Sequence, residues 1–426
     1  MNTLRFGTDG IRGIYGTTLT EDTAYRLGAA LAGYGKILIG RDNRPSSLSL
    51  AHALCCGVTA NGGTFRAVGV VTTPALYYLL TVSDCDAAVM VTASHNPPEY
   101  NGLKVFTKKG KLSDAERREI EERMLAFTPL CACAYPFAEK SDLARYENYV
   151  KSKIGDLTGV KVVVDLAGGA GSALRGLYGA LGASVTVLNA REDGSRINEG
   201  CGALHPEVCR EEVLRKGADI GVAIDGDGDR IVAVTKRGTI LDGDLVTYLL
   251  ALRMKARGKL NKDRVVMTVM TNSGVLKSLT EMGVTPLSCA IGDAALASAM
   301  QAENLNLGGE QSGHVILGDL LPTGDGLLVG AALMKSILTD GPLDDTPLPS
   351  VYPQVLLNVA VKDKSVANDE AVRRAAAEVK EKLKEGRVLL RASGTESLVR
   401  IMVEHPDEQK AKRAADFLRS VVLGKA

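Results

Sequence analysis

Residues 219–230 read Asp-Ile-Gly-Val-Ala-Ile-Asp-Gly-Asp-Gly-Asp-Arg, a short apolar run followed directly by a glycine-rich acidic loop. The run has the length and the β-branched character of a buried strand. The loop that follows places three carboxylates on alternate residues. This stretch therefore predicts a strand that ends in a polar site, and the same arrangement recurs along the chain.

Other short apolar runs also lead into a polar or glycine-rich loop and then into a helical pattern. They lie at residues 36–40, 87–91, 161–165 and 265–269, and the loops read RDNRPSS, TASHNPP, LAGGAGS and MTNSG. Strands that alternate with helices at this spacing are typical of α/β units with parallel or mixed sheets. In such sheets ligands bind at the carboxyl ends of the strands, where these loops lie.

The last part of the chain has a different pattern. Strands are expected at residues 355–361, 388–390 and 398–403, with a helix over 368–384 and a final helix closing the chain. The pattern predicts a small, separate α+β unit. Joints between units are expected near residues 143–150, 241–244 and 341–352, of which the last is rich in Pro and Asp.

Composition narrows the class of protein. The 426 residues carry 51 basic and 50 acidic side chains, a net charge of +1, so nothing attracts nucleic acid or an anionic membrane in general. The amino-terminal residues lack the pattern of a secretory signal, and no apolar stretch approaches the ~20 residues of a membrane span. Eight cysteines form no zinc pattern and are expected to be buried apolar side chains in a reducing cytosol. The chain is thus expected to be cytoplasmic.

The loop from Asp225 to Asp229 predicts a bound cation. Two carboxylates about 5 Å apart repel by about 3 kcal/mol at an effective dielectric near 20, and three converging ones need a counter-charge. Oxygen ligands favour a hard ion such as Mg²⁺ or Ca²⁺. An EF-hand loop would need Gly at its sixth position and Glu at its twelfth, where this chain has Arg230 and Lys236. A solvated acidic turn is the remaining alternative.

Ser94 lies in Thr92-Ala-Ser-His-Asn-Pro97, directly after an apolar strand, so it should be presented at a strand end. The G-x-S-x-G motif of a serine hydrolase is absent, and in an extended segment His95 would point away from Ser94. Such a serine is often only part of a turn. Beside a metal loop it gains a chemical meaning, because Mg²⁺ bridges carboxylates and phosphoryl oxygens.

Two further loops carry polar groups suited to a sugar phosphate. In Gly308–His314, the side chains of Glu310, Ser312 and His314 alternate and could grip sugar hydroxyls. Arg391–Thr395 combines a guanidinium, hydroxyls and glycine amides, which are the parts of a phosphate cradle. Either segment taken alone is equally well an ordinary surface loop.

Five loops taken in order resemble those of the α-D-phosphohexomutase family. They are GTDGIRG at Gly7, TASHNP at Thr92, DGDGDR at Asp225, GGEQSGH at Gly308 and RASGTES at Arg391. Within the family, GGEQSGH, INEGCGALHPE (residues 197–207) and YPQVLLNV (352–359) resemble the bacterial branch that acts on glucosamine phosphates.

The resemblance implies an α/β fold of four domains around a central cleft. Three related α/β/α domains with mixed sheets would be followed by a smaller α+β domain that acts as a lid. The expected limits are 1–147 with the phosphoserine loop, 148–243 with the metal loop, 244–349 with the sugar-binding loop and 350–426 with the phosphate-binding loop.

The resemblance also implies roles for individual residues. Ser94 would be the phosphorylated serine and, with Asp225, Asp227 and Asp229, a ligand of Mg²⁺. Lys104, Arg12 and His314 would join Ser94 as catalytic residues, with the choice of base between Lys104 and His314 left open. Substrate contacts are implied for His95, Arg230, Glu310, Ser312, Arg391, Ser393, Gly394, Thr395 and Arg400.

The implied reaction interconverts glucosamine 6-phosphate and glucosamine 1-phosphate and feeds amino-sugar nucleotide and cell-wall precursor synthesis. Glucosamine or glucose 1,6-bisphosphate would be the activator. The partners would be small sugar phosphates and, in a possible homodimer, a second copy of the chain. Neither nucleic acid nor membrane would be bound. Two positions depart from the family pattern: Ser397 stands where Pro is usual, and Ala294 where a basic residue is common.

Three alternatives remain. A phosphoglucomutase or phosphomannomutase would use the same chemistry, and residues 197–207 and 308–314 argue against it. A non-catalytic sugar-phosphate-binding protein would have no need for a nucleophile such as Ser94. A Mg²⁺-dependent phosphatase would use an Asp nucleophile and would have little use for the loop at Arg391.

Overall fold

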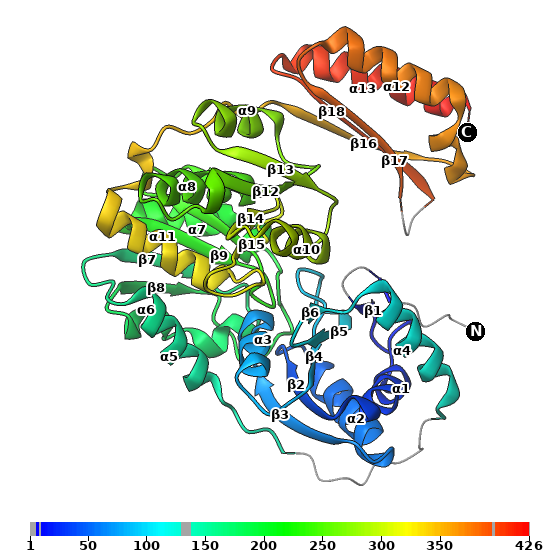
Figure 1. The fold of residues 1–426 in the computed structure, drawn as a ribbon, viewed down its shortest axis with the longest axis vertical. Coiled ribbons are helices and arrows are strands. Elements are labelled where there is room, and N and C mark those ends of the chain that lie inside the picture. The colour runs from blue at the N-terminus through cyan, green and yellow to red at the C-terminus, as the bar shows by residue number, and fades with distance from the viewer. Residues whose placement is uncertain (1–5, 8–9, 129–137, 394–396, 426) are drawn as a thin grey trace. The chain divides into compact units, whose positions relative to one another are not determined.

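A computed structural model describes residues 6–7, 10–128, 138–393 and 397–425 (Figure 1). The chain divides into two compact units. The larger comprises Met1–Met270 with Thr285–Pro347, and the smaller comprises Thr271–Val284 with Leu348–Ala426.

Three sheets of the larger unit share one topology. In each, a central strand pairs in parallel with two neighbours, and the later of these pairs antiparallel with the next strand of the chain, in the orders β3-β2-β4-β5, β8-β7-β9-β10 and β13-β12-β14-β15. This repetition confirms the prediction of three related α/β units with mixed sheets.

The elements of the larger unit follow one another as strand and helix. The first sheet and its helices are β1 (Ile11–Ile14), α1 (Glu21–Leu31), β2 (Lys36–Arg41), α2 (Ser47–Ala60), β3 (Thr64–Val70), α3 (Thr73–Thr81), β4 (Ala87–Val91), β5 (Tyr100–Thr107), β6 (Gly110–Lys111) and α4 (Asp114–Ala126). The second group is α5 (Leu143–Ile154), β7 (Lys161–Asp165), α6 (Leu177–Ala180), β8 (Ser184–Leu188), α7 (Pro206–Lys216), β9 (Ile220–Ile224), β10 (Ile231–Thr235), β11 (Ile240–Leu241) and α8 (Gly243–Ala256). The third is β12 (Arg264–Thr268), β13 (Thr285–Cys289), α10 (Asp293–Glu303), β14 (Leu307–Gly309), β15 (Val315–Leu317) and α11 (Gly326–Asp340).

The strands that precede the loops carrying Ser94, Asp225 and Glu310 are buried along their whole length. Every residue of β4, β9 and β14 is buried. Strands covered on both faces read as continuous apolar runs, which is why β4 coincides with the run predicted at residues 87–91. Each loop is thereby anchored on a rigid strand.

The smaller unit is an antiparallel sheet covered by helices. Its elements are α9 (Ser273–Glu281), β16 (Gln354–Ala360), α12 (Glu370–Leu383), β17 (Arg387–Ala392), β18 (Leu398–Glu404) and α13 (Glu408–Leu423). The strand order is β16-β18-β17, and α12 and α13 lie together over one face (Figure 1). Val399, Ile401 and Val403 of the central strand form its core with residues of both helices. The predicted α+β unit is confirmed.

The limits of the four expected domains stay predictions. The limit between residues 147 and 148 falls inside α5, so the joint expected near 143–150 is helical.

Of the eight cysteines, Cys131 and Cys133 lie outside the described residues, and four of the others follow the prediction. Cys55, Cys85, Cys201 and Cys209 are free and buried, and Cys289 is free and half-buried. Cys56 is disulfide-bonded, which the expectation of reduced thiols did not include.

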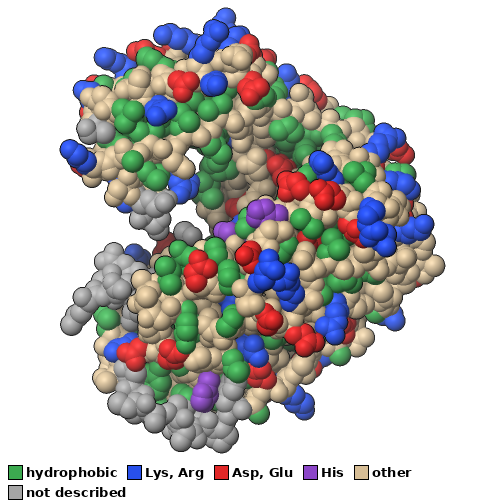
Figure 2. Space-filling model, turned by 180° about the vertical axis from the view of Figure 1, so that it is seen from behind, with side chains coloured by type: hydrophobic (Ala, Val, Ile, Leu, Met, Phe, Trp, Pro, Cys, Tyr) green, Lys and Arg blue, Asp and Glu red, His purple; other side chains and the backbone are tan. Residues whose placement is uncertain are grey.

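Among the described residues, no helix is both long enough and apolar enough to cross a membrane. On the face drawn in Figure 2, basic and acidic side chains are interspersed over the described surface. This mixture agrees with the net charge of +1.

A buried carboxylate joins two helices of the larger unit. Asp325 caps α11 by accepting a hydrogen bond from the Leu328 amide at 3.0 Å, and it accepts another from the Tyr146 hydroxyl of α5 at 2.5 Å. Its residue is only 2% exposed. Burial raises the pKa of Asp325 to about 6, although both hydrogen bonds oppose the rise.

We expect the raised pKa of Asp325 to make stability pH-dependent. The folded protein holds this proton up to about pH 6, whereas the unfolded chain releases it near pH 4. Stability from this group is therefore full below pH 4 and is lost as the pH rises through 6, by at most about 3 kcal/mol. Asp325→Asn keeps the cap without the charge. Calorimetry measures the midpoint of thermal unfolding of this variant and of the parent. The difference in favour of the variant should grow by several degrees as the pH rises from 4 to 7. A difference that does not change with pH would contradict the raised pKa.

Candidate active site

The three polar loops of the larger unit occupy the same place in their sheets. Residues 92–99 connect β4 to β5, residues 225–230 connect β9 to β10, and residues 310–314 connect β14 to β15. Each loop thus leaves the carboxyl end of a buried strand and returns as its antiparallel neighbour. The sequence expectation that the polar loops lie at carboxyl ends of strands is confirmed at these positions.

Ser94 is buried and has an unusual backbone. Its residue is 1% exposed, and its φ of 53° lies in the left-handed region. The hydroxyl Oγ donates to Asp225 Oδ2 at 2.7 Å. His95 Nδ1 lies 3.4 Å from the same Oγ. The expectation that His95 points away was wrong, because the left-handed conformation of Ser94 departs from an extended segment.

The three carboxylates of the acidic loop converge. Asp225, Asp227 and Asp229 are buried, and one oxygen of each lies within 4.8 Å of the others. The Lys104 ammonium of β5 contacts Asp227 Oδ2 at 2.8 Å and Asp229 Oδ2 at 3.0 Å. Thr73 Oγ1 donates to Asp227 Oδ2 at 2.6 Å. Lys104 therefore supplies one positive charge to three carboxylates.

The surroundings drive the proton affinities of these carboxylates apart. Burial, followed by the negative charges of Asp229 and Asp227, raises the pKa of Asp225 well above its usual range. Burial also works to raise the pKa of Asp227, but Lys104 and Thr73 outweigh it and hold that pKa below its usual range. Burial and the neighbouring carboxylates thus disfavour the charged form of Asp225, which a further cation would stabilise.

The cluster fits a divalent cation. Asp227 Oδ1 and Asp229 Oδ1 are buried and have no hydrogen-bond partner among the described residues. Buried carboxylate oxygens without a partner are costly unless something positive binds them. An oxygen-only donor set is what Mg²⁺ or Ca²⁺ prefers.

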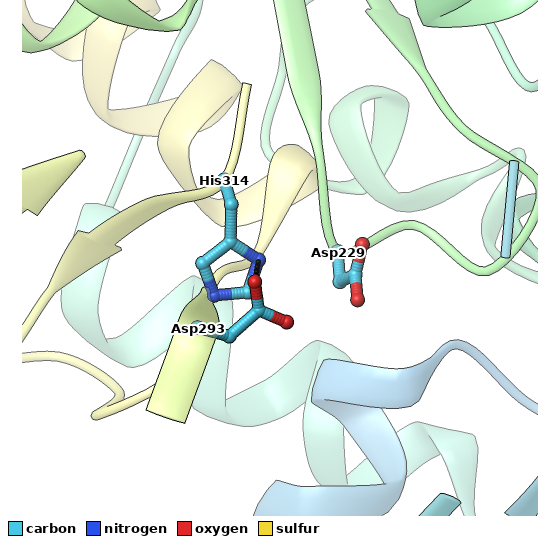
Figure 3. Close-up of side chains that lie close together, drawn as sticks. All are labelled: Asp229, Asp293 and His314. Carbon is cyan, nitrogen blue, oxygen red and sulfur yellow. Dashed lines mark ion pairs between the residues drawn. The ribbon is translucent and has the colours of Figure 1, made fainter. Parts of the chain in front are cut away.

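His314 belongs to a neighbouring cluster with Asp229 and Asp293 (Figure 3). The Gly324 amide donates to His314 Nε2 at 3.2 Å, so the neutral imidazole carries its proton on Nδ1. That nitrogen faces Asp293 Oδ1 at 3.7 Å. Asp293 also pairs with Lys111 at 2.6 Å. Nε2 of His314 is thus hydrogen-bonded, whereas Nδ1 is buried without a hydrogen-bond partner among the described residues.

The remaining predicted residues of the larger unit lie on these loops and on β1. Glu310 is 7% exposed, accepts from the Gly292 amide at 2.8 Å and accepts from Ser312 Oγ at 3.2 Å. Arg12 of β1 donates to Asn96 Oδ1 at 3.1 Å.

The charge of Arg230 affects His95, and the charges of the acidic loop affect Arg230. Burial, followed by the charges of Arg230 and Arg12, lowers the pKa of His95 to about 4, so His95 is neutral at pH 7. Burial alone would lower the pKa of Arg230, but Asp229 and Asp225 raise it. The Arg230 guanidinium Nε lies 3.9 Å from Asp229 Oδ1.

In the smaller unit, Arg391 of β17 and Arg400 of β18 are directly opposite each other in the antiparallel register. Like charges at such positions are destabilising unless an anion lies between them. The Ser393 amide donates to the Leu398 carbonyl at 2.9 Å and closes the loop. Gly394 and Thr395 lie outside the described residues.

Sequence reasoning missed several side chains that support this site. Asp42 and Arg44 follow β2, Asn198 lies in the 197–207 segment, and Thr73 and Asp293 begin helices α3 and α10. The sequence predicts the loop RDNRPSS after the strand at residues 36–40, but nothing in its composition indicates which other loop it contacts. Only the pairing of distant segments reveals these roles.

Ala294, the departure from the family pattern, lines a cavity of about 1160 Å³ in the larger unit together with Lys111, Asp293 and His314. Asp293 receives positive charge here from Lys111 of β6, at 2.6 Å.

Sequence comparison finds three matches to the phosphoglucomutase/phosphomannomutase family. The alpha/beta/alpha domain I matches residues 3–128, the alpha/beta/alpha domain III matches 242–348, and the C-terminal domain matches 356–421.

Similar proteins cover almost the whole chain. A phosphoglucosamine mutase of Caldicellulosiruptor bescii is 39% identical over 98% of both chains, and one of Staphylococcus haemolyticus is 40% identical over 99% of this chain and 98% of its own. A phosphoglucomutase/phosphomannomutase family protein of Burkholderia thailandensis has a similar structure, with a TM-score of 0.80, 25% identity, and coverage of 100% and 98%. An N-acetylphosphoglucosamine mutase of Aspergillus fumigatus, solved with GlcNAc-6P and magnesium, shares the fold at a TM-score of 0.64 and 18% identity, covering 91% of this chain and 83% of its own.

We expect divalent-cation binding to depend on Asp225 and not on Asp293. In EDTA, Asp225→Asn removes a carboxylate that repels two others, so the midpoint of thermal unfolding should stay level or rise. In excess MgCl₂ the parent should gain stability, about 2.7 kcal/mol at a hundred times the dissociation constant, and the variant should gain little. Calorimetry with and without Mg²⁺ measures both effects.

Asp293→Asn is the matched control, because Asp293 belongs to the neighbouring cluster and is already paired with Lys111. Loss of the Mg²⁺ response in Asp293→Asn, with retention in Asp225→Asn, would contradict this assignment and place the cation at the cluster of Asp229, Asp293 and His314.

Proposed function

The chain belongs to the phosphoglucomutase/phosphomannomutase family, and on that premise we propose that it is a phosphoglucosamine mutase, an isomerase that interconverts glucosamine 6-phosphate and glucosamine 1-phosphate. The observation that carries the proposal is the Ser94 hydroxyl, buried and held 2.7 Å from Asp225 within a cluster of three carboxylates. Identities of 39% and 40% to phosphoglucosamine mutases over nearly the whole chain support the choice of sugar.

Asp225, Asp227, Asp229 and the Ser94 oxygen would hold the cation, for which we propose Mg²⁺. When bound, Mg²⁺ supplies positive charge to the phosphoryl oxygens during transfer. Lys104 and Arg230 stand beside the same carboxylates and add two further positive charges. Electrostatic positioning of this kind provides most of the catalysis of phosphoryl transfer.

The reaction proceeds through phosphorylated Ser94. The bond between phosphorus and Ser94 Oγ breaks as a sugar hydroxyl oxygen bonds to the phosphorus, and the hydroxyl proton passes to a base. The product is a sugar 1,6-bisphosphate, which turns around and returns its other phosphoryl group to Ser94. Added glucosamine or glucose 1,6-bisphosphate would activate the enzyme by phosphorylating Ser94 directly.

We propose Lys104 as the base: it would accept the hydroxyl proton as a neutral amine and so become the ammonium that contacts Asp227 and Asp229. His314 Nε2 already accepts a hydrogen bond from the Gly324 amide, so its lone pair is occupied, and in that tautomer Nδ1 carries the ring proton. His314 and Arg12 would then act by orienting and neutralising the substrate.

Glu310 and Ser312 would bind sugar hydroxyls, with His95 donating or accepting as a neutral imidazole. Arg391, Ser393, Gly394, Thr395 and Arg400 would bind the phosphate that does not react. The opposed guanidinium groups of Arg391 and Arg400 suit a dianion. A location in the cytoplasm and a homodimer stay predictions.

We expect turnover of glucosamine 6-phosphate with Mg²⁺ and a trace of sugar bisphosphate, measured against glucose and mannose phosphates. Ser94→Ala should lower kcat by at least about 10³-fold, because the phosphoryl carrier is lost. Preference for glucose or mannose phosphate would agree with the mechanism and contradict the proposed sugar. Ala294→Arg would then test the effect of the departure from the family pattern at position 294. No turnover, with Ser94 never phosphorylated in mass spectra, would favour a non-catalytic binding protein.

We further expect Lys104 and His314 to separate kinetically. Lys104→Met should reduce kcat by about 10²–10⁴-fold, the usual contribution of a base, with Mg²⁺ saturating. His314→Gln keeps an acceptor for the Gly324 amide and should reduce kcat less than about tenfold. Steady-state kinetics of both variants decide the point, and the reverse order would make His314 the base.

A further inference from the structure

Arg44 lies behind the serine loop with its guanidinium fully engaged. The residue is 1% exposed. Its Nε donates to Asp42 Oδ2 at 2.9 Å, Nη1 donates to the Tyr100 carbonyl at 2.9 Å and also to the Pro97 carbonyl, and Nη2 donates to the Asn96 carbonyl at 2.7 Å and the Ser94 carbonyl at 3.0 Å. A guanidinium has five N–H donors, and all five are used.

Asp42 holds Arg44 in place. In addition to the Arg44 side chain, the Asp42 carboxylate accepts hydrogen bonds from the Arg44 amide at 3.0 Å, from Thr92 Oγ1 at 2.7 Å and from Ser47 Oγ at 2.5 Å. Thr92 is the first residue of the serine loop and also accepts from the Ser94 amide at 3.0 Å. One buried ion pair therefore ties both the start of the loop and its carbonyls to the end of β2.

Asn198 contacts the same carbonyls from the second sheet. Its Nδ2 donates to the Ser94 carbonyl at 2.9 Å and to the Asn96 carbonyl at 3.0 Å. Each of these two oxygens thus accepts from both Arg44 and Asn198. The acidic loop also approaches the Ser94 carbonyl closely, since a Cβ added at Gly226 would lie 2.7 Å from the carbonyl oxygen.

These contacts fix the direction of the Ser94 side chain. A non-glycine residue at φ 53° persists only where its surroundings determine the backbone, and here the carbonyl is held from two sides. With the carbonyl and φ fixed, the Cα–Cβ bond of Ser94 has a fixed direction, and from there Oγ reaches Asp225 Oδ2 at 2.7 Å. When phosphorylated, the side chain carries extra negative charge beside three carboxylates, which would push an untethered loop away.

We propose that Arg44 and Asn198 are positioning residues that clamp the Ser94 carbonyl and so aim the phosphoserine at the metal cluster. Its kinetic consequence rests on the proposed mutase function; the clamp itself does not. Neither side chain contacts the reacting oxygen, so each acts through the loop backbone.

The test combines kinetics with hydrogen exchange of the full-length protein. Arg44→Lys keeps the charge but has only three donors on a single nitrogen, and Asn198→Asp keeps the shape and the tolerance of positive φ while replacing the donor with an acceptor. Each should lower kcat by about 10–100-fold with KM for glucosamine 6-phosphate within about twofold. Amide exchange in residues 93–101 should quicken at least about tenfold, with that of α2 and β9 unchanged.

Two matched controls separate the clamp from general effects. Arg41→Lys makes the same chemical change three residues away, where the guanidinium pairs with Glu139 at 2.6 Å and donates to the Asp42 carbonyl at 3.3 Å; neither partner lies in the serine loop. Asn304→Asp makes the other change at an exposed residue with φ 52°. Both should leave kcat and loop exchange as in the parent.

The outcomes are distinct. Unchanged loop exchange, or faster exchange with unchanged kcat, would overturn the proposal, as would a rise in KM equal to the fall in kcat. Faster exchange throughout the molecule would show a merely structural role. If Arg44→Lys fails to fold, Asn198→Asp decides alone. If the parent itself turns over no sugar phosphate, the proposed function fails, and the exchange comparison still decides the clamp.

Discussion

The repulsion among Asp225, Asp227 and Asp229 is the constraint to which the rest of the site responds. Three buried carboxylates within 4.8 Å cannot all be charged without compensation. Lys104 supplies part of it, and the raised pKa of Asp225 reflects the charge that is still uncompensated. Asp227 Oδ1 and Asp229 Oδ1 have no hydrogen-bond partner among the described residues, which suits the proposed cation. The Ser94 hydroxyl donates to Asp225, so the serine lies at the same concentration of negative charge.

A repeated topology brings these charges together. The serine, acidic and Glu310 loops each join a buried parallel strand to an antiparallel neighbour, so one structural solution presents three different chemistries. Strands buried on both faces hold their ends rigidly, which suits residues that must be placed within a few tenths of an ångström. The third loop differs in use: its Glu310 and His314 are turned toward the helix α10 that begins at Asp293.

Asymmetry between side chains of one type follows from their partners. Lys104 is buried against two carboxylates, whereas Lys111 pairs with Asp293 from strand β6. Arg44 gives one donor to the Asp42 carboxylate and the other four to backbone carbonyls, whereas Arg41 pairs with the Glu139 carboxylate. Arg391 and Arg400 are directly opposite each other in the register of β17 and β18. Residue type alone predicts none of these differences.

The sequence by itself determined the strands, the α/β repeat, the small α+β unit and the loops that carry Ser94, the three aspartates and Glu310. It did so because apolar periodicity, β-branched runs and glycine-rich turns are local signals. Only the tertiary structure decided that His95 turns toward Ser94, that His314 Nε2 accepts from the Gly324 amide, and that Arg44 and Asn198 hold the Ser94 carbonyl. These depend on a left-handed backbone angle and on contacts between residues up to 104 positions apart. Local sequence patterns carry no information about such pairings, because the free energy that selects them comes from burial and charge in the assembled fold.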